Sequence, residues 1–346
     1  SIQGWYHAPA APKGAEMASI NQLKTIADLN ATNKSNSNNS NSSKTASSVP
    51  AEVSTWKLSD YDLNFLKEYI NPIYLEHTAF DSISDKYINN SYVELRNFLN
   101  NKTALKVNNN LFMKENNNNN ILNSENWKLL GPAHVQRYLQ YDSNKKGTFV
   151  LNDIKTKLFE SNSFKKLIHI FTGESKPFTI TNDAVKVRCF RKGMDYTLAH
   201  NGLLLPEGDS RLDCNLCFVD DGLLNINGSK KNNGNTEVNN DKIIDWESGE
   251  RGGFECYIAA ENEDNEAAEV YKHDNDDDDG GIVLSVSPRF NTLSLALRDD
   301  GTMRFIKYVS SVAPSNRYDI STSYCVDYSD DEEEEEDKEE EAFESE

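Results

Sequence analysis

The chain has 346 residues, of which 56 are acidic and 36 are basic, and its formal net charge is -20. This excess of negative charge argues against binding to nucleic-acid phosphates or anionic membranes, because both need clustered lysine and arginine. No apolar run approaches the ~18 residues of a membrane-spanning helix. Five cysteines, an odd number, fit a reducing compartment better than a disulfide framework. We expect a protein of the nucleus and cytoplasm without nucleic-acid or membrane partners.

The two ends of the chain differ in composition from its middle. Ser1-Ile2-Gln3-Gly4-Trp5 looks like the end of a strand whose upstream part is absent, and a short helical stretch is expected around Glu16–Leu29. Residues 30–50 are dominated by Asn, Ser, Thr, Lys and Ala, which cannot bury enough apolar surface to offset the entropy of ordering. They are predicted to be a disordered linker, and the acidic residues 329–346 a disordered tail.

Residues 51–176 are predicted to form a helical layer. Apolar residues recur every three or four positions after a helix start at Ser59. Ser163 is expected to cap the last helix, which would end at Gly173. The later helices are expected at Tyr87–Leu99, Trp127–Tyr141, Leu151–Leu158 and Phe164–Phe171.

Residues 177–328 change to a period of two, with turn residues at short intervals. Short strands are expected at Lys186–Arg191, Asp195–Ala199, Leu212–Val219, Gly253–Ala259, Ile282–Val286, Thr292–Leu297, Met303–Val309 and Tyr318–Val326. Such strands, joined by Gly, Asp and Asn turns, indicate an antiparallel sandwich or jelly roll. The predicted fold class is therefore α+β, with a helical layer preceding and packing on a β-sandwich.

The residue types that usually carry chemistry do not assemble into a site by spacing. Cys214 and Cys217 form a C-x-x-C, but the sequence has no second pair for zinc. Alternation places the two thiols on opposite faces of a strand, so buried structural cysteines are expected. His200 lies in the β region without an H-x-D or H-E-x-x-H pattern, and a lone histidine is usually structural. The glycine-rich segment Trp246–Gly253 precedes a strand, which favours a tight turn over a phosphate loop.

Several longer segments are more specific than composition can explain. They are Trp127–Pro132 with Arg137–Leu139, Phe190–His200, Trp246–Gly249 with Gly252–Tyr257, and Ser287–Arg298 with Met303–Val309. Together they resemble the C-terminal domain of the ribosomal-protein prolyl hydroxylases, iron(II)- and 2-oxoglutarate-dependent oxygenases of the termination-and-polyadenylation type. The resemblance covers Leu58 to Val326 outside the insertions. It implies that residues 177–328 form a degenerate double-stranded β-helix (a jelly-roll, cupin-like fold).

In that family the catalytic domain comes first, and its last strand has the pattern R-x-S-I-x-G-W. Ser1–Trp5 matches this pattern from its serine onward. The resemblance therefore implies that residues 1–29 are the end of a catalytic domain, with Ser1 as a neighbour of 2-oxoglutarate. The arginine that grips the co-substrate and the facial triad would lie before Ser1, so no catalytic residue is expected in this chain.

The resemblance also implies a vestigial copy of the site in the second domain. Arg317 takes the place of the arginine, and His200 takes the first metal-ligand position, while Gly202 replaces the aspartate. Lys307 falls at the distal histidine, with a slip of one residue left open. A facial 2-His-1-carboxylate site needs three ligands, so no metal is expected here.

The resemblance implies a parent enzyme that hydroxylates a proline of a small-subunit ribosomal protein, uses iron(II), 2-oxoglutarate and ascorbate, and acts with the translation-termination machinery. This chain would be its non-catalytic half, with homodimerisation left open. One alternative is a competent dioxygenase that uses His200 with a carboxylate such as Asp195 or Asp213. Another is an acidic partner-binding scaffold, unrelated to hydroxylation, that depends on Asp330–Glu346.

Overall fold

The computed structural model divides the chain into two units, Ser1–Glu52 and Val53–Glu346. All residues that it describes belong to the second unit: 56–113, 125–143, 149–173, 176–179, 185–222, 246, 249–260 and 282–327. Three predicted segments lie outside these residues: the strand remnant at 1–29, the linker at 30–50 and the acidic tail at 329–346. No helix in the described ranges combines the length and apolar character needed to cross a membrane.

The helices lie in the first half of the described chain. They are α2 (Asp60–Lys67), α3 (His77–Asn90), α4 (Asn101–Asn108), α5 (Val150–Ile154) and α6 (Asn162–Phe171). Single turns of 3-10 helix occupy Pro72–Leu75 and Asn201–Leu203, and π-helical turns occupy Asn109–Met113 and Lys155–Phe159.

The strands fall into a larger and a smaller sheet. Within each sheet, every described pair of neighbouring strands is antiparallel. The larger sheet has the order β1-β10-β7-β12-β5-β3-β2, and the smaller has the order β11-β8-β9. The strands are β1 (Tyr92–Arg96), β2 (Trp127–Leu130), β3 (Gln136–Tyr141), β4 (Lys176–Thr179), β5 (Lys186–Phe190), β6 (Tyr196–Thr197), β7 (Arg211–Phe218), β8 (Glu255–Ala259), β9 (Ile282–Val286), β10 (Thr292–Arg298), β11 (Thr302–Ile306) and β12 (Arg317–Asp327).

The connectivity is that of a double-stranded β-helix. From β5 onward the chain passes back and forth between the two sheets, so that β5, β7, β10 and β12 belong to the larger one and β8, β9 and β11 to the smaller. The short strand β6 lies next to β11, where the amide of Ile306 donates to Oγ1 of Thr197 at 2.7 Å. The predicted fold class, an α+β protein with a jelly-roll sandwich, is confirmed.

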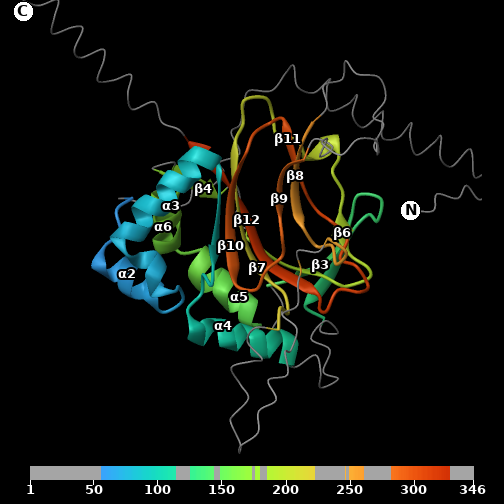
Figure 1. Cartoon of the computed structure of the whole chain (residues 1–346), viewed down its shortest axis with the longest axis horizontal. Coiled ribbons are helices and arrows are strands. Elements are labelled where there is room, and N and C mark those ends of the chain that lie inside the picture. The colour runs from blue at the N-terminus through green and yellow to red at the C-terminus, as the bar shows by residue number, and fades with distance from the viewer. Residues whose placement is uncertain are drawn as a thin grey trace, which may run out of the picture. The chain divides into compact units, whose positions relative to one another are not determined.

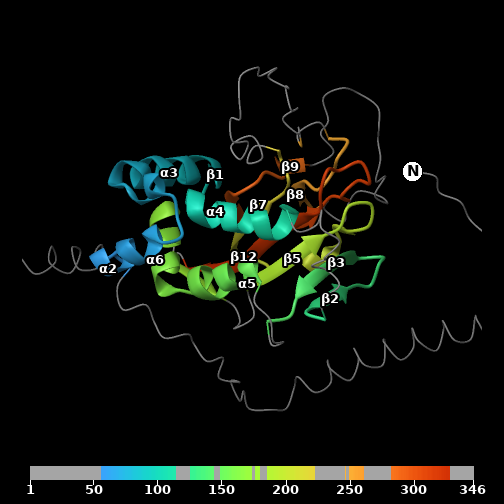
Figure 2. The same ribbon diagram turned by 90° about the horizontal axis from the view of Figure 1, so that it is seen from below.

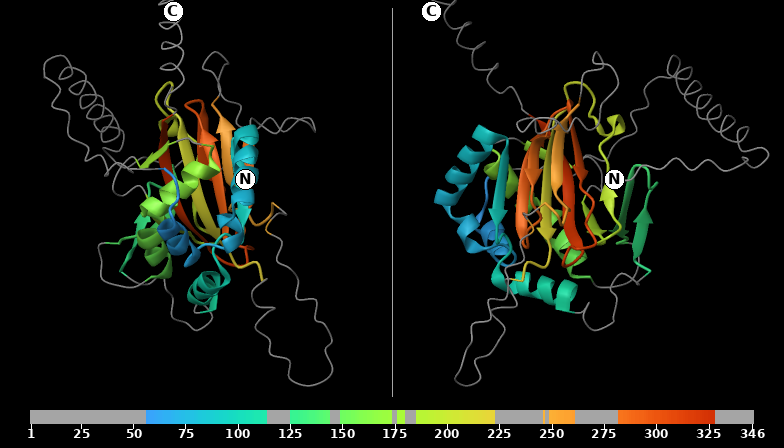
Figure 3. Two further views of the ribbon diagram at one scale, coloured as in Figure 1. Left: turned by 90° about the vertical axis from the view of Figure 1, so that its left-hand side faces the viewer. Right: turned by 45° about the vertical axis from the view of Figure 1, so that its right-hand side comes forward.

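The helices cover one face of the larger sheet, and the smaller sheet faces the other (Figure 1). In a second view the helices run across the strands of the larger sheet (Figure 3, left). Side chains from both layers form the main apolar core, including Leu216 and Leu295 of the sheet and Phe98 and Phe164 of the helical layer, all fully buried. The main hydrophobic core therefore lies between the sheet and the helices.

The predicted helix start at Ser59 is confirmed by a capping box. The Ser59 hydroxyl accepts a hydrogen bond from the amide of Asp62, and the Asp62 carboxylate accepts one from the amide of Ser59. The prediction for α6 was wrong in one detail, because Ser161 caps this helix by accepting from the amide of Phe164 at 3.1 Å. Ser163 instead donates its hydroxyl to Asp62 at 2.7 Å and so ties α6 to the start of α2.

Two of the predicted helices are wrong. The segment Tyr87–Leu99 ends as helix at Asn90, because Ser91 adopts a left-handed conformation (φ 53°), and the chain continues as β1. The segment Trp127–Tyr141 forms β2 and β3, which extend the larger sheet at the end away from α2 and α3 (Figure 2). The described residues between 56 and 176 thus form a layer of helices that also contributes strands to the sheet.

Candidate functional site

The space between the two sheets is polar. Along β7, Leu212, Cys214 and Leu216 belong to the apolar core beside the helices. The alternate residues Asp213 and Asn215 form side-chain hydrogen bonds and ion pairs with residues of the smaller sheet. Because successive side chains of a strand point to opposite faces, β7 separates an apolar layer from a charged one.

Seven charged side chains meet in this space, and we call them the inter-sheet ion network. They come from β5, β7, β10 and β12 of the larger sheet and from β8 and β11 of the smaller sheet. The members are Arg188, Asp213, Glu255, Arg298, Arg304, Arg317 and Asp319.

Glu255 of β8 is the centre of the network and is fully buried. Its Oε1 accepts from Nε of Arg304 at 2.6 Å and from the hydroxyl of Tyr257 at 3.1 Å. Its Oε2 accepts from Nδ2 of Asn215 at 2.6 Å and from Nη2 of Arg317 at 3.3 Å. Burial alone would raise the pKa of Glu255, but Arg304 and Arg317 outweigh burial and lower it. Glu255 is therefore held as an ionised carboxylate.

Arg304 of β11 bridges the two sheets. Its Nη1 lies 3.1 Å from Oδ1 of Asp213 on β7, while its Nη2 lies 2.5 Å from Oε1 of Glu255. Asp213 also accepts from Nε of Arg298 at 2.9 Å and from the hydroxyl of Ser323. The carboxylate oxygens of Asp213 are thus occupied by partners from β10, β11 and β12.

Arg317, the position that the resemblance equates with the co-substrate arginine, lies inside this network. Its Nη2 lies 3.3 Å from Oε2 of Glu255 and 3.4 Å from Oδ2 of Asp319, and its guanidinium carbon lies 5.5 Å from the ring centroid of Phe190. Cys217, Asp319 and Glu255 together outweigh the effect of burial and raise the pKa of Arg317. Nη2 of the guanidinium is thus already paired with two carboxylates of the chain itself, whereas Nε and Nη1 have no hydrogen-bond partner among the described residues.

The other three vestigial positions lie apart from Arg317. His200 is half-buried in the loop after β6, Gly202 is exposed in the next turn, and Lys307 is exposed just after β11. In the part of the chain that the structure describes, no hydrogen bond or ion pair joins His200 to Lys307 or Arg317. Lys307 instead extends over the ring of Phe254, with Nζ 6.0 Å from its centroid. The predicted register at Lys307 stays a prediction, and the neighbouring Ile306 is the buried residue there.

These residues do not fit an iron site. A Cβ atom added at Gly202 would lie 2.9 Å from Nδ1 of His200, so the histidine ring fills the space that an aspartate would need. Lys307 offers an ammonium group, which has no lone pair for a metal. Among the described residues, no group of three His, Cys, Asp or Glu side chains could hold a metal ion. This donor set is too small for the facial triad.

The residues do not fit 2-oxoglutarate either. The co-substrate would bring a carboxylate to the Arg317 guanidinium, where Glu255 and Asp319 already supply two. A further carboxylate there would lie beside the two that already pair with this guanidinium and would repel them. No step of an oxygenase reaction is therefore assigned to this space.

The two carboxylates named in the competent-oxygenase alternative have other partners. Asp195 is fully buried and accepts from the amide of Arg191 and from its Nε at 2.7 Å, with Nε of Arg137 at 3.8 Å. Asp213 is held by Arg298 and Arg304. Neither carboxylate forms a described contact with His200, so the geometry argues against that alternative.

The cysteine prediction agrees with the structure. Cys214 lies in the apolar core beside the helices, whereas Cys217 packs in a second cluster with Phe190, Ile306 and Val309. Burial raises the pKa of both thiols. All five cysteines are free thiols in the structure.

Sequence reasoning missed the ion network as a unit. A signal was present, because charged residues replace apolar ones at alternate positions within otherwise apolar strands, as in Leu212–Phe218 and Arg317–Tyr324. The partners are brought together by pairing over long distances, however. Asp213 and Arg298 are neighbours only because β7 pairs with β10.

This chain is similar to two solved structures and to a curated protein. A prolyl hydroxylase from Trichoplax adhaerens, in complex with a peptide fragment of the hypoxia inducible factor oxygen degradation domain, is 12% identical, with a TM-score of 0.41 over 79% of this chain and 95% of that one. A Pseudomonas putida prolyl-4-hydroxylase is 9% identical, with a TM-score of 0.39 over 71% of this chain and 98% of that one.

A curated relative is the prolyl 3,4-dihydroxylase OGFOD1 of Ostreococcus tauri, which is 27% identical over 341 residues. The alignment covers 94% of this chain and 58% of the relative, so the chain spans a little over half of the relative's length. The family model described as "oxoglutarate and iron-dependent oxygenase degradation C-term" matches residues 61–333, which include both sheets and their helical layer. The chain therefore belongs to this family of C-terminal domains of oxoglutarate- and iron-dependent oxygenases.

Proposed function

We propose that this chain is the non-catalytic C-terminal part of a prolyl hydroxylase that depends on iron(II) and 2-oxoglutarate, and that it serves as a scaffold and partner-binding domain. The observation that carries the proposal is the ion pair of Arg317 with Glu255, because the position expected to grip the co-substrate is already paired with a carboxylate of the chain itself. His200 has neither a carboxylate at Gly202 nor a second histidine beside it. The curated relative's name supports prolyl hydroxylation as the activity of the parent protein.

In this proposal, iron, 2-oxoglutarate and ascorbate act in a catalytic domain upstream of the family domain at residues 61–333, with Ser1 next to its co-substrate. A proline of a small-subunit ribosomal protein would be the substrate, and the translation-termination machinery the wider partner, in the nucleus and cytoplasm. The net charge of -20 supports this choice, because an acidic protein attracts a basic ribosomal protein over long range.

The test compares metal content and succinate formation from 2-oxoglutarate in two proteins: this chain, and the same chain extended upstream through a complete catalytic domain. We expect stoichiometric iron and succinate only in the extended protein. His200→Ala in the extended protein should change neither, because this histidine is not a ligand. Stoichiometric iron in the short chain that is lost in His200→Ala would contradict the proposal and support the competent-oxygenase alternative.

The acidic-scaffold alternative makes a different prediction about the tail. Deleting Asp330–Glu346 would abolish partner binding without unfolding the rest of the chain if that alternative were correct. Under our proposal the deletion weakens binding only as far as it lowers long-range attraction, and raising the salt concentration should reproduce most of its effect.

A further inference from the structure

A small pocket of about 220 Å³ lies at one end of β2, β3 and β5 in the larger sheet, beside the helical layer. We call it the lysine pocket, because three of its lining residues are lysines from different elements. They are Lys128 of β2, Lys155 of the π-helical turn after α5, and Lys186 of β5. The pocket therefore gathers positive charge from segments that are far apart in the sequence.

Strand pairing places two of these lysines on the face of the sheet that carries the inter-sheet ion network. Lys128 pairs with Gln140 of β3, and Gln140 pairs with Arg188 of β5, which belongs to the network. Lys186 comes two residues before Arg188 in the same strand, so the two side chains point to the same face. Lys128 and Lys186 therefore lie on the same side of the sheet as the network.

The ammonium groups of the lysine pocket are only partly paired. Lys155 is almost fully buried, donates to the hydroxyl of Ser143 at 3.1 Å and lies 3.6 Å from Oε1 of Glu160. An ammonium group has three N–H donors, so at least one donor of Lys155 remains for a ligand. Lys128 and Lys186 form no ion pair with any residue that the structure describes.

The neighbouring ion network does not compensate this positive charge. It contains four guanidinium groups but only three carboxylates. Partial burial and the charges of Arg188 and Arg304 lower the pKa of Lys186. Asp142, the acidic residue of the pocket lining, already has an interaction of its own. A bound anion would therefore relieve the repulsion among these cations.

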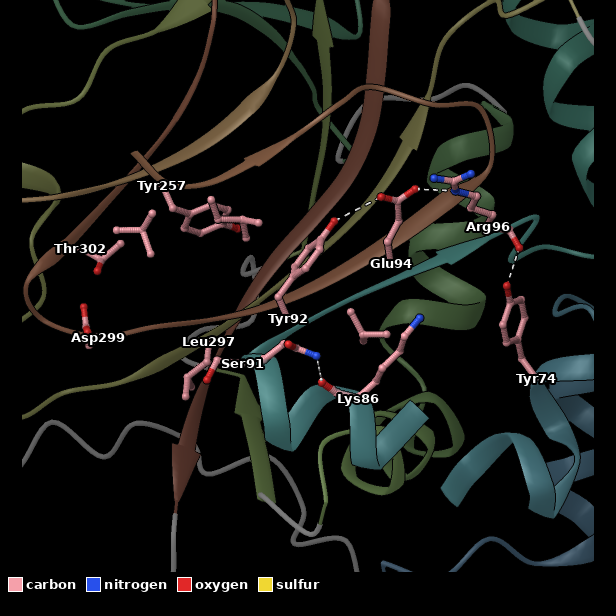
Figure 4. A pocket seen from close by; sticks show the side chains of 14 residues that line it. Tyr74, Lys86, Ser91, Tyr92, Glu94, Arg96, Tyr257, Leu297, Asp299 and Thr302 are labelled. Atoms are coloured by element: carbon pink, nitrogen blue, oxygen red, sulfur yellow. Dashed lines mark hydrogen bonds and ion pairs between the residues drawn. The ribbon is translucent and has the colours of Figure 1, made fainter. Parts of the chain in front are cut away.

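A larger cleft at the side of the sandwich, of about 1000 Å³, has a balanced charge. Its charged lining residues are two basic ones, Lys86 and Arg96, and two acidic ones, Glu94 and Asp299 (Figure 4). Arg96 and Glu94 also bond to each other at 2.9 Å. This cleft has no preference for either sign of charge, whereas the lining of the lysine pocket has three basic residues and one acidic residue.

We propose that the lysine pocket binds a single phosphate group, either of inorganic phosphate or of a phosphate monoester. A phosphate group carries up to two negative charges and enough acceptor oxygens for each of the three ammonium groups to contact a different one. A carboxylate has one charge and two oxygens, so it would leave one lysine without an acceptor. The pocket is also smaller than those that hold drug-sized ligands, which suits a small anion.

The first experiment titrates inorganic phosphate into the whole chain and measures the heat of binding by isothermal titration calorimetry. The ionic strength is held constant, so that general screening of charge does not change during the titration. Acetate is the control anion with one charge. We expect saturable phosphate binding with a Kd on the order of 1 mM or below, and acetate binding at least ~10-fold weaker.

Substitutions of single lysines test where the phosphate binds. Lys128→Gln and Lys186→Gln each remove one ammonium group from a different strand, and each should weaken phosphate binding about 10-fold. Lys157→Gln is the matched control, because Lys157 is exposed in the same π-helical turn as Lys155 but does not line the pocket. Circular dichroism and the unfolding midpoint without phosphate check the fold of each variant. If one of the two pocket variants is misfolded, the other decides the question.

A short glycine peptide with one phosphoserine distinguishes the two sources of the phosphate group. Tighter binding of this peptide than of inorganic phosphate would support the site and assign it to a phosphate monoester, and equal or weaker binding would support it as a site for the free ion. The inference would be overturned if phosphate did not bind saturably, or if acetate bound equally well. Unchanged binding in both Lys128→Gln and Lys186→Gln, or an equal loss in Lys157→Gln, would also overturn it. Iron content and succinate formation are separate readouts, so failure here leaves the non-catalytic assignment standing.

Discussion

Arg317 and Glu255 meet between the two sheets, with Nη2 of the arginine 3.3 Å from Oε2 of the glutamate and both side chains almost fully buried. Such a pair is favourable only when further hydrogen bonds satisfy both charges. Glu255 meets this condition through Asn215, Tyr257 and Arg304, whereas Nε and Nη1 of Arg317 have no hydrogen-bond partner among the described residues. The pair also connects β12 of the larger sheet with β8 of the smaller one, so it holds the sandwich together in the space where a co-substrate would otherwise lie.

Removing the charge of Glu255 should therefore destabilise the fold strongly. We expect Glu255→Gln to lower the free energy of unfolding by about 3–5 kcal/mol, because Arg304 and Arg317 would lose their shared buried carboxylate. Urea denaturation followed by tryptophan fluorescence measures the loss. Glu250→Gln, at an exposed turn position, is the matched control and should change the free energy by no more than about 0.5 kcal/mol. Equal effects of the two substitutions would contradict a structural role for the network.

Asp62 gives the fold a dependence on pH. Burial would raise its pKa, but hydrogen bonds from Ser163, Ser59 and Lys166 outweigh burial and lower it well below its usual value of 3.8. A carboxyl whose pKa is lowered in the folded state stabilises the fold above its unfolded pKa, and this contribution is lost as pH falls toward the folded value.

The corresponding measurement is the free energy of unfolding between neutral pH and about pH 3 in the natural chain and in Asp62→Asn. At neutral pH the substitution should cost about 1–2 kcal/mol, because it weakens the capping box and the contact to Lys166 at 2.9 Å. The difference should shrink as the pH falls below about 4. A difference that stays constant across this range would show that the charge of Asp62 does not stabilise the fold. Asp60→Asn, at an exposed position in the same helix, is the control.

The strands of the sandwich were predictable because each shows an alternation of apolar and polar residues within its own sequence. The predicted Ile282–Val286 coincides with β9, and the predicted Thr292–Leu297 differs from β10 by a single residue. The helical layer was harder to predict. Val93 and Leu95 are buried two residues apart in a strand that pairs with β10, about two hundred positions away in the sequence, so their surroundings are not visible locally.

Local features of the sequence explain why the end of α3 and the strands in Trp127–Tyr141 were not predicted. Ser91 takes a left-handed conformation that glycine or asparagine more often adopts, so the sequence gives little indication that α3 ends here. In Trp127–Tyr141, spacing suited a helix, but Leu139 and Tyr141 are buried among the core residues while Tyr138 packs in the second cluster. Short apolar runs are ambiguous between helix and strand until their neighbours are known. The ion network escaped prediction for the same reason, since no two of its carboxylates are neighbours in sequence.

Gly252 should be intolerant of any side chain. It adopts φ +66°, and a Cβ atom added there would lie 1.8 Å from the carbonyl oxygen of Tyr308, which is backbone and cannot move aside cheaply. We expect Gly252→Ala to lower the free energy of unfolding by more than about 2 kcal/mol. Gly208 is the control: its φ is +80° but no atom lies within 4 Å of the added Cβ, so Gly208→Ala should cost only about 1 kcal/mol. Similar losses in both variants would show that backbone conformation, and not the close approach to Tyr308, limits position 252.

The thiols should be protected in the folded chain. Cys189, Cys214, Cys217 and Cys256 are buried, and burial raises the pKa of the last three, so they lack both access and thiolate. Cys325 is half-buried and its sulfur lies 3.0 Å from Nη1 of Arg211.

We expect Ellman's reagent to modify at most one thiol in the native chain, Cys325, and all five after unfolding in guanidinium. Cys325→Ser should then abolish the native reaction without changing the count of the other thiols. Cys217→Ser is the matched control at a buried position and should leave the native reaction unchanged. Rapid native modification of Cys214 or Cys217, or release of zinc on titration, would show instead that the C-x-x-C is accessible or bound to metal, and would contradict the burial of both thiols in β7.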